Sequence, residues 1–164
     1  MNPEKSIGRV PWLTKDGFFD PAKFPIDSIL KQTLDTDEHA FRSGVGLLQS
    51  MCVHGRREAG IFLLGLLLAS DDNLERRGVI VEALRNVPTK PCADLLFAEL
   101  RRVKSSNTTR RYLASVIKVL ASLPAELVVD GFAELADDKS FSQKMRGKFR
   151  AVICSGPSSG DDWY

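Results

Sequence analysis

The sequence lacks any apolar run that could cross a membrane. Its longest run covers residues 59–69, which is only 11 residues, whereas a helical span needs about 20. Cysteines are also few: Cys52, Cys92 and Cys154 form an odd and widely spaced set. Such a set argues against a disulfide framework and favours a reducing, cytoplasmic setting. Residues 1–5 lead into no apolar signal-peptide core. We therefore expect a cytoplasmic protein with no membrane partner.

Groups typical of catalysis are scarce as well. The chain has two histidines, His39 and His54, and no Cys-x-x-Cys, His-x-x-x-His or glycine-rich phosphate loop. The neighbouring Asp71 and Asp72 could form a metal-binding carboxylate pair, but helix capping explains both residues more simply. The sequence thus predicts a protein that is not an enzyme, with no catalytic residues, no metal and no cofactor.

What the sequence does contain is enough apolar material for one domain. Of its 164 residues 43% are apolar, and the formal charge of +2 is too small to identify a partner by itself. Residues 1–25 combine four prolines with Trp12, Phe18 and Phe19, which predicts an irregular aromatic arm packed on the body. Residues 155–164 are typical of a flexible tail. Their Ser-Gly-Pro-Ser-Ser-Gly string resembles an engineered linker, and their acidic-aromatic end would suit a short partner-binding motif.

The chain between these two ends has the apolar spacing of helices throughout. Apolar residues recur three and four positions apart, as in Tyr112, Leu113, Val116, Ile117 and Leu120. This pattern predicts an all-α fold over residues 26–154. The expected helices cover residues 26–34, 37–53, 57–69, 73–87, 91–103, 108–122, 125–136 and 142–153.

Several features recur at intervals of 35 residues. The strings at 97–100 and 132–135 are both Phe-Ala-Glu-Leu, and Phe62, Phe97 and Phe132 share this spacing, so we expect three equivalent buried phenylalanines. A second series has side chains suited to capping a helix N-terminus, and a third consists of arginines. These two series are Asp37, Asp72, Asn107 and Ser142, and Arg76, Arg111 and Arg146. A fixed period of this length indicates stacked helix pairs, because one pair alone cannot bury its apolar faces.

The turn and helix at residues 68–84 carry a resemblance to a known family. Asp71 lies in the turn, Arg77 follows six residues later, and an apolar run ends in Glu-Ala-Leu. This pattern resembles HEAT and HEAT-like (armadillo-type) α-helical repeats. The resemblance implies an α-α superhelix, or solenoid, of about four antiparallel pairs at 26–53, 57–87, 91–122 and 125–153. It also implies that Asp71 and Arg77 take part in a hydrogen-bonded ladder between neighbouring repeats.

Charge is graded along the second helices of these pairs. Their formal charges are −1, +1, +3 and +4 from the first pair to the last. In HEAT-like folds the second helices line the concave face, so the resemblance implies a groove that becomes basic toward the C-terminus. The candidate binding residues are Arg76, Arg77, Arg110, Arg111, Lys118, Arg146 and Arg150. We expect four of them, Arg111, Lys118, Arg146 and Arg150, to gather into one patch.

This pattern leaves three functions open. The first is a protein-binding scaffold or adaptor whose basic groove receives an acidic surface or segment. The second is a nucleic-acid-binding HEAT-like protein, since phosphates also bind basic grooves. The third, which the sequence favours least, is a HEAT-like lyase or glycosylase-type enzyme, which would need a catalytic acid and aromatic platforms in the groove. Inter-repeat hydrogen bonds could also account for the arginine series without any ligand.

Overall fold

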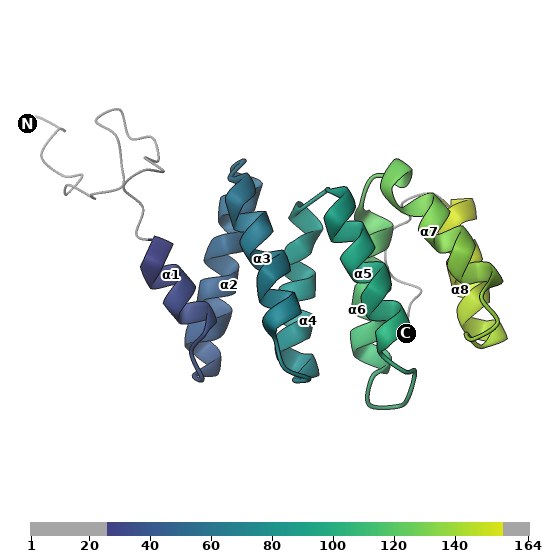
Figure 1. The fold of residues 1–164 in the computed structure, drawn as a ribbon, viewed down its shortest axis with the longest axis horizontal. Coiled ribbons are helices and arrows are strands. Elements are labelled where there is room, and N and C mark those ends of the chain that lie inside the picture. Colours follow the sequence, from purple (N-terminus) through teal and green to yellow (C-terminus); the bar gives the residue numbers. More distant parts are fainter. Residues whose placement is uncertain (1–25, 156–164) are drawn as a thin grey trace, which may run out of the picture. The chain divides into compact units, whose positions relative to one another are not determined.

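A computed structural model describes residues 26–155 of the chain (Figure 1). The predicted N-terminal arm and the tail after Ser155 lie outside these residues. Within them the chain is all-helical, with no strand. The helices are α1 (Ile26–Thr33), α2 (Glu38–Val53), α3 (Arg57–Ala69), α4 (Leu74–Ala83), α5 (Lys90–Arg102), α6 (Arg110–Ser122), α7 (Ala125–Asp137) and α8 (Gln143–Ser155), with a 3₁₀ turn, η2 (Leu84–Asn86), after α4. The helix boundaries expected from sequence agree within two residues, except that α4 ends early and continues as η2.

The chain divides into two compact units, residues 1–44 and 45–164. In the described part of the first unit, α1 packs closely on the beginning of α2. Gly44 makes this approach possible, because a Cβ atom there would lie 2.9 Å from the backbone nitrogen of Thr33. Ile29 and Phe41 are buried in this part of the chain. Asp37 caps α2 as predicted, since its Oδ2 accepts a hydrogen bond from the Ala40 N–H at 2.8 Å.

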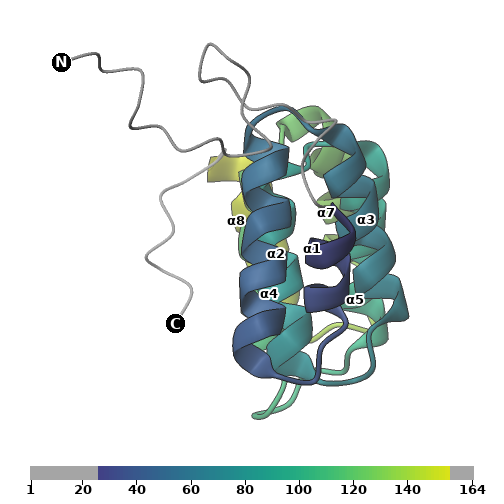
Figure 2. The ribbon, with the colours of Figure 1, turned by 90° about the vertical axis from the view of Figure 1, so that its left-hand side faces the viewer.

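In the second unit, α3 to α8 form two layers of three helices. Figure 1 shows α3, α5 and α7 in front of their partners, and Figure 2, which looks along the row, places α4 and α8 on the opposite side from α3, α5 and α7. Within one layer α4 packs on α6, and within the other α5 packs on α7. The pairs α3/α4, α5/α6 and α7/α8 are also in contact within themselves. The core between the layers is almost entirely aliphatic and aromatic.

The buried positions repeat from helix to helix, but not at a constant interval of 35. Buried Ala59 and Leu63 of α3 match buried Cys92 and Leu96 of α5, 33 residues later in each case. Buried Ile80 and Leu84 match Val116 and Leu120 of α6, 36 residues later. Only α5 and α7 keep the interval of 35, through Phe97 and Phe132. The connections explain the drift, because four residues join α3 to α4, seven join α5 to α6 and five join α7 to α8.

This drift corrects one prediction about the core. Phe97 and Phe132 are buried as expected, and their rings meet edge to face with centroids 5.2 Å apart. Phe62 is only half-buried. With the interval of 33, the α3 position equivalent to Phe97 is Leu64, so Phe62 lies on a different part of the helix surface. The Phe97 ring also lies against the backbone of α7 at Gly131, where a Cβ atom would clash with it.

The same drift changes two of the four predicted caps. Ser142 does cap α8, since its hydroxyl accepts from the Met145 N–H at 3.2 Å. Before α4, however, the cap is Asn73 and not Asp72. Before α6, Asn107 accepts from the Arg110 guanidinium, and Thr109 occupies the N-cap position without a capping bond. Asp72 instead pairs with Arg102 at 2.9 Å.

Candidate functional site

Arg77, predicted as part of an exposed groove, is buried between α4 and α5. Its guanidinium donates to both carboxylate oxygens of Glu99, at 2.7 and 3.3 Å. Its third nitrogen donates to the backbone carbonyl oxygens of Ser70 and Asp71, at 2.9 and 3.4 Å. The side chain is only 5% exposed. Arg77 therefore joins two helix pairs and does not belong to an exposed binding surface.

Glu99 is the centre of this network, and nothing in the sequence pointed to it beyond the Phe-Ala-Glu-Leu string. Besides Arg77, it accepts hydrogen bonds from Arg102, at 3.0 and 3.2 Å, and from the Tyr112 hydroxyl. Burial by itself would raise the pKa of Glu99, but the bonds from Arg102, Tyr112 and Arg77 outweigh it, and the net pKa is lowered. Burial, followed by the hydrogen bond that its hydroxyl donates to Glu99, raises the pKa of Tyr112. Glu99 is thus a charged, fully hydrogen-bonded connection between α4, α5 and α6.

Outside this network, α6 and α8 carry only basic charged residues. Neither helix contains Asp or Glu, whereas α6 has three basic residues and α8 has four. On α6, Arg111 is exposed and Lys118 is half-buried. They are seven residues apart and share one flank of the helix. Neither forms an ion pair with an acidic side chain in the described part of the chain.

The α8 residues that match this flank are two lysines that the sequence reasoning passed over. Val116 of α6 and Phe149 of α8 are both buried and 33 residues apart. At that interval Lys144 matches Arg111, and half-buried Lys148 matches half-buried Ser115. Lys144 is exposed and, like Arg111, has no ion pair among the described residues. We call the set Arg111, Lys118, Lys144 and Lys148 the basic face.

Arg146 and Arg150, the two α8 members of the predicted patch, are turned toward the end of α7. Arg150 donates to the carbonyl oxygen of Ala136 at 3.1 Å and lies 3.7 Å from Asp137. The pKa of Asp138 is lowered first by hydrogen bonds from Ser140, with smaller contributions from Arg101 and Arg146. The predicted set of four is therefore divided: Arg111 and Lys118 lie on the basic face, and the two arginines lie beside the α7 C-terminus.

The two remaining candidates also have interaction partners. Arg110 is exposed and donates to Asn107 Oδ1 at 3.1 Å. Arg76 is half-buried and is likewise not free of contacts. Neither residue lies on the helix flank that forms the basic face.

The layer opposite the basic face is acidic where α5 meets α7. Helix α7 contains four acidic residues and no basic one. A polar groove of about 370 Å³ runs between the two helices, over Phe97 and Gly131. One ion pair crosses the groove, from Arg101 of α5 to Glu134 of α7 at 3.2 Å. Another, from Lys90 to Asp94 at 2.8 Å, lies along α5 at its edge. The two layers of the last pair thus differ in the sign of their charge.

The remaining chemistry-bearing residues have structural surroundings. All three cysteines are free, and burial raises the pKa of the Cys92 thiol to about 12, which keeps it protonated and unreactive. Nδ1 of His54 lies 2.7 Å from the carbonyl oxygen of Ser50, within its own helix end. Among residues 26–155 no cluster of three His, Cys, Asp or Glu could hold a metal ion.

No helix in this range combines the length and apolarity that a membrane crossing requires. Comparison with protein-family models, with curated proteins and with solved structures finds no match for this chain.

Proposed function

We propose that this protein is a HEAT-like α-solenoid scaffold that binds an acidic protein partner through its basic face. The observation that carries this proposal is the absence of any acidic residue from α6 and α8, beside the exposed and unpaired Arg111 and Lys144. Like charges held on rigid helices repel one another, and an acidic ligand offsets that cost. A surface of stacked helices suits protein binding because it is broad and preformed.

A protein partner is favoured over single-stranded nucleic acid by the aromatic residues of these helices. Tyr112 and Phe149 are the aromatic residues of α6 and α8, and both are buried. The basic face therefore offers no ring on which a base could stack. Duplex nucleic acid, bound through its phosphates alone, is the second candidate.

A lyase or glycosylase activity has less support. Such an enzyme would need a carboxylate on the basic face to act as acid or base. The two helices supply none, and the buried Glu99 is already bonded to Arg77, Arg102 and Tyr112. We therefore propose a non-catalytic role in the cytoplasm, without metal or cofactor.

The proposal is tested by reversing charge on the basic face. The double variant Arg111→Glu with Lys144→Glu is compared with Lys104→Glu with Lys139→Glu, which changes two exposed loop lysines and has the same net charge. The probes are a fluorescent glutamate-rich peptide and a DNA duplex of equal charge. We expect the first variant to lose about tenfold or more in peptide affinity, equivalent to about 1.4 kcal/mol, and the control to change little.

Two results would contradict the proposal. Equal peptide affinity in both variants would exclude the basic face as the binding surface. Much tighter binding of the duplex, with an affinity that falls steeply as salt is raised, would assign the face to phosphates. Circular dichroism of both variants establishes that helical content is retained.

A further inference from the structure

Helix α3 is apolar on all sides, although only one side of it is covered. Every residue in the range 59–69 is apolar or glycine. One side packs on α4 and η2 and buries Leu63 and Leu67. On the opposite side Ile61 and Leu68 are each 71% exposed, more than any other large apolar side chain described in the second unit. A helix that is apolar all round is normally buried all round, so a second contact is expected on this side.

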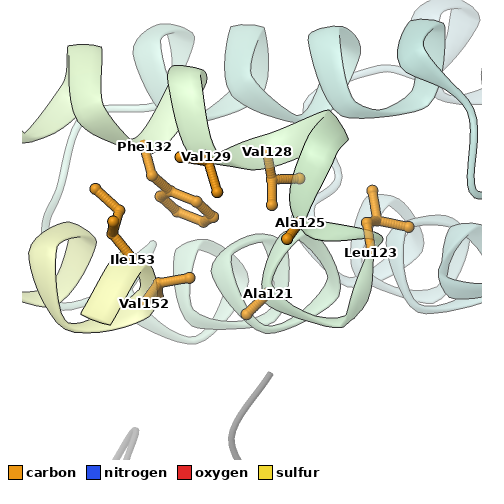
Figure 3. A pocket seen from close by; sticks show the side chains of 8 residues that line it. All are labelled: Ala121, Leu123, Ala125, Val128, Val129, Phe132, Val152 and Ile153. Carbon is orange, nitrogen blue, oxygen red and sulfur yellow. The ribbon is translucent and has the colours of Figure 1, made fainter. Parts of the chain in front are cut away.

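The other helices of this layer have no such open apolar face. At the interval of 33 that relates α3 to α5, Ile61 matches Asp94. Leu68 matches Arg101 in the same way, and both of these charged residues are exposed and ion-paired. On α7 the exposed Val129 lines a hollow of about 50 Å³ whose walls come from α6, α7 and α8, so its own chain partly covers it (Figure 3). The apolar face left open by the described chain is therefore a feature of α3.

The outer face of α3 is complementary to itself when two copies lie antiparallel. We define this face as Ile61, Leu64, Gly65 and Leu68, whose spacing of three and four residues places them along one side of the helix. With the midpoint between Leu64 and Gly65, Ile61 of each copy lies against Leu68 of the other. Leu64 of each copy then lies over Gly65 of the other, where a Cβ atom would meet open space. The glycine leaves room for the leucine, so the two helices can pack closely.

The charges at the two ends of α3 favour the antiparallel arrangement. Arg57, the first residue of the helix, is exposed and has no ion pair among the described residues. Asp71 and Asp72 lie just beyond the other end, and the Asp72 side chain stays 88% exposed although it pairs with Arg102. The midpoint given above places Arg57 of each copy beside Asp72 of the other. A parallel pair would instead bring like charges together at both ends.

We propose that the outer face of α3 is the contact surface of a twofold-symmetric homodimer, in which α3 of one copy packs antiparallel on α3 of a second copy. Because both copies use the same surface, the assembly closes at two. The helix is about 20 Å long, so the contact is smaller than that of a permanent dimer, and we expect a dissociation constant in the micromolar range. Helix α3 lies in the layer opposite α8 (Figure 2). The basic face therefore stays free, and the proposal does not depend on the function proposed above.

The first test measures the monomer–dimer equilibrium of the full-length chain. Sedimentation velocity is recorded from about 1 µM to about 500 µM, and we expect the natural protein to convert from monomer to dimer over this range. Leu68→Lys introduces a charge at both ends of the contact and should weaken dimerisation by about tenfold or more. The matched control is Val53→Lys, which changes a side chain that is 62% exposed at the end of α2. It should leave the equilibrium unchanged.

A second test exchanges the charges at the two ends of α3. Arg57→Asp and Asp72→Arg should each weaken dimerisation several-fold, because like charges then meet across the contact. The variant with both changes should recover most of the loss, since opposite charges meet again. The two positions lie at opposite ends of the helix, about 20 Å apart, so the recovery can arise only between copies.

Any of four results would overturn the proposal. The first is a protein that remains monomeric at every concentration. The second is an equal effect of Leu68→Lys and Val53→Lys, and the third is no recovery in the charge-exchanged variant. The fourth is growth beyond the dimer that added salt reverses, which would assign self-association to the basic face of one copy and the acidic α7 of another. Circular dichroism of each variant checks that the helices are intact.

Discussion

The string Phe-Ala-Glu-Leu occurs once on α5 and once on α7, and its two glutamates have opposite surroundings. The phenylalanine and the leucine are buried in both copies. Glu99 is 5% exposed and bonded to Arg77, whereas Glu134 is 72% exposed and meets Arg101 at the surface. The difference lies on the preceding second helix, where Arg77 of α4 is replaced at the equivalent position of α6 by Leu113. The same four-residue sequence thus has its glutamate in the core in one copy and at the surface in the other. Which of the two occurs depends on the residue that the preceding helix pair places beside that glutamate.

The largest expected effect comes from removing the buried member of this comparison. Glu99→Ala removes the acidic partner of the buried Arg77 charge, which keeps only its bonds to two carbonyl oxygens, and should lower the free energy of unfolding by about 3–5 kcal/mol. Glu134→Ala removes an exposed ion pair and should cost less than about 1 kcal/mol. Urea unfolding followed by circular dichroism measures both. Equal losses would mean that the network contributes no more than a surface pair.

A second variant replaces the buried polar network around Glu99 with apolar side chains. The triple change Arg77→Met, Glu99→Met and Tyr112→Phe removes the charges and the hydroxyl together. Replacing a buried ion pair with apolar residues is often neutral or stabilising, so this variant should be more stable than Glu99→Ala by about 2 kcal/mol or more. If it is less stable than the single variant in the same urea titration, apolar packing cannot replace the network here.

The two glycines at 131 and 147 give a third contrast, within the last pair. Gly131→Ala would place a methyl group in the Phe97 ring and should cost about 1–3 kcal/mol. Gly147 has open space around its Cβ position, so Gly147→Ala should stabilise α8 by about 0.5–1 kcal/mol through helix propensity. Thermal unfolding should therefore shift in opposite directions. If the melting temperatures of both variants rise, the Phe97 ring moves aside to make room for the added methyl group.

The smallest expected effect is a change in acid sensitivity. The pKa of Glu99 is lowered in the folded state. Its contribution to the free energy of unfolding is therefore fully present above the usual carboxyl pKa of about 4.3. That contribution is lost as pH falls through the lower, folded-state pKa. Melting temperatures measured from pH 6 to pH 2 should fall more steeply for the natural protein than for Glu99→Gln. Parallel curves would contradict a lowered pKa.

Much of the fold could be predicted from sequence, because apolar spacing and helix caps are local signals. They located the eight helices of residues 26–155, their pairing and the burial of Phe97, Phe132 and Tyr112. The constant interval of 35 was the misleading signal. Loops of four, seven and five residues shift the helices relative to one another, so Phe62 and Asp72 lost their predicted roles.

The candidate site was less predictable, because it depends on which residues of different helices meet. Counting charges identified α6 and α8 correctly as basic helices. It could not separate Lys144, which shares the flank of Arg111, from Arg150, which bonds to the α7 C-terminus. Nor could it show that Arg77 is buried, since its partner Glu99 is 22 residues away in sequence.

The sorting of charge between α7 and α8 makes the last helix pair an electric dipole. Four acidic residues on one helix and four basic residues on the other are separated by about 8–10 Å, the usual distance between packed helix axes. The field of such a pair extends for roughly one Debye length, about 8 Å in physiological salt. A charged molecule that approaches this end is therefore rotated before it touches the surface. Added salt should slow its association while leaving its dissociation nearly constant.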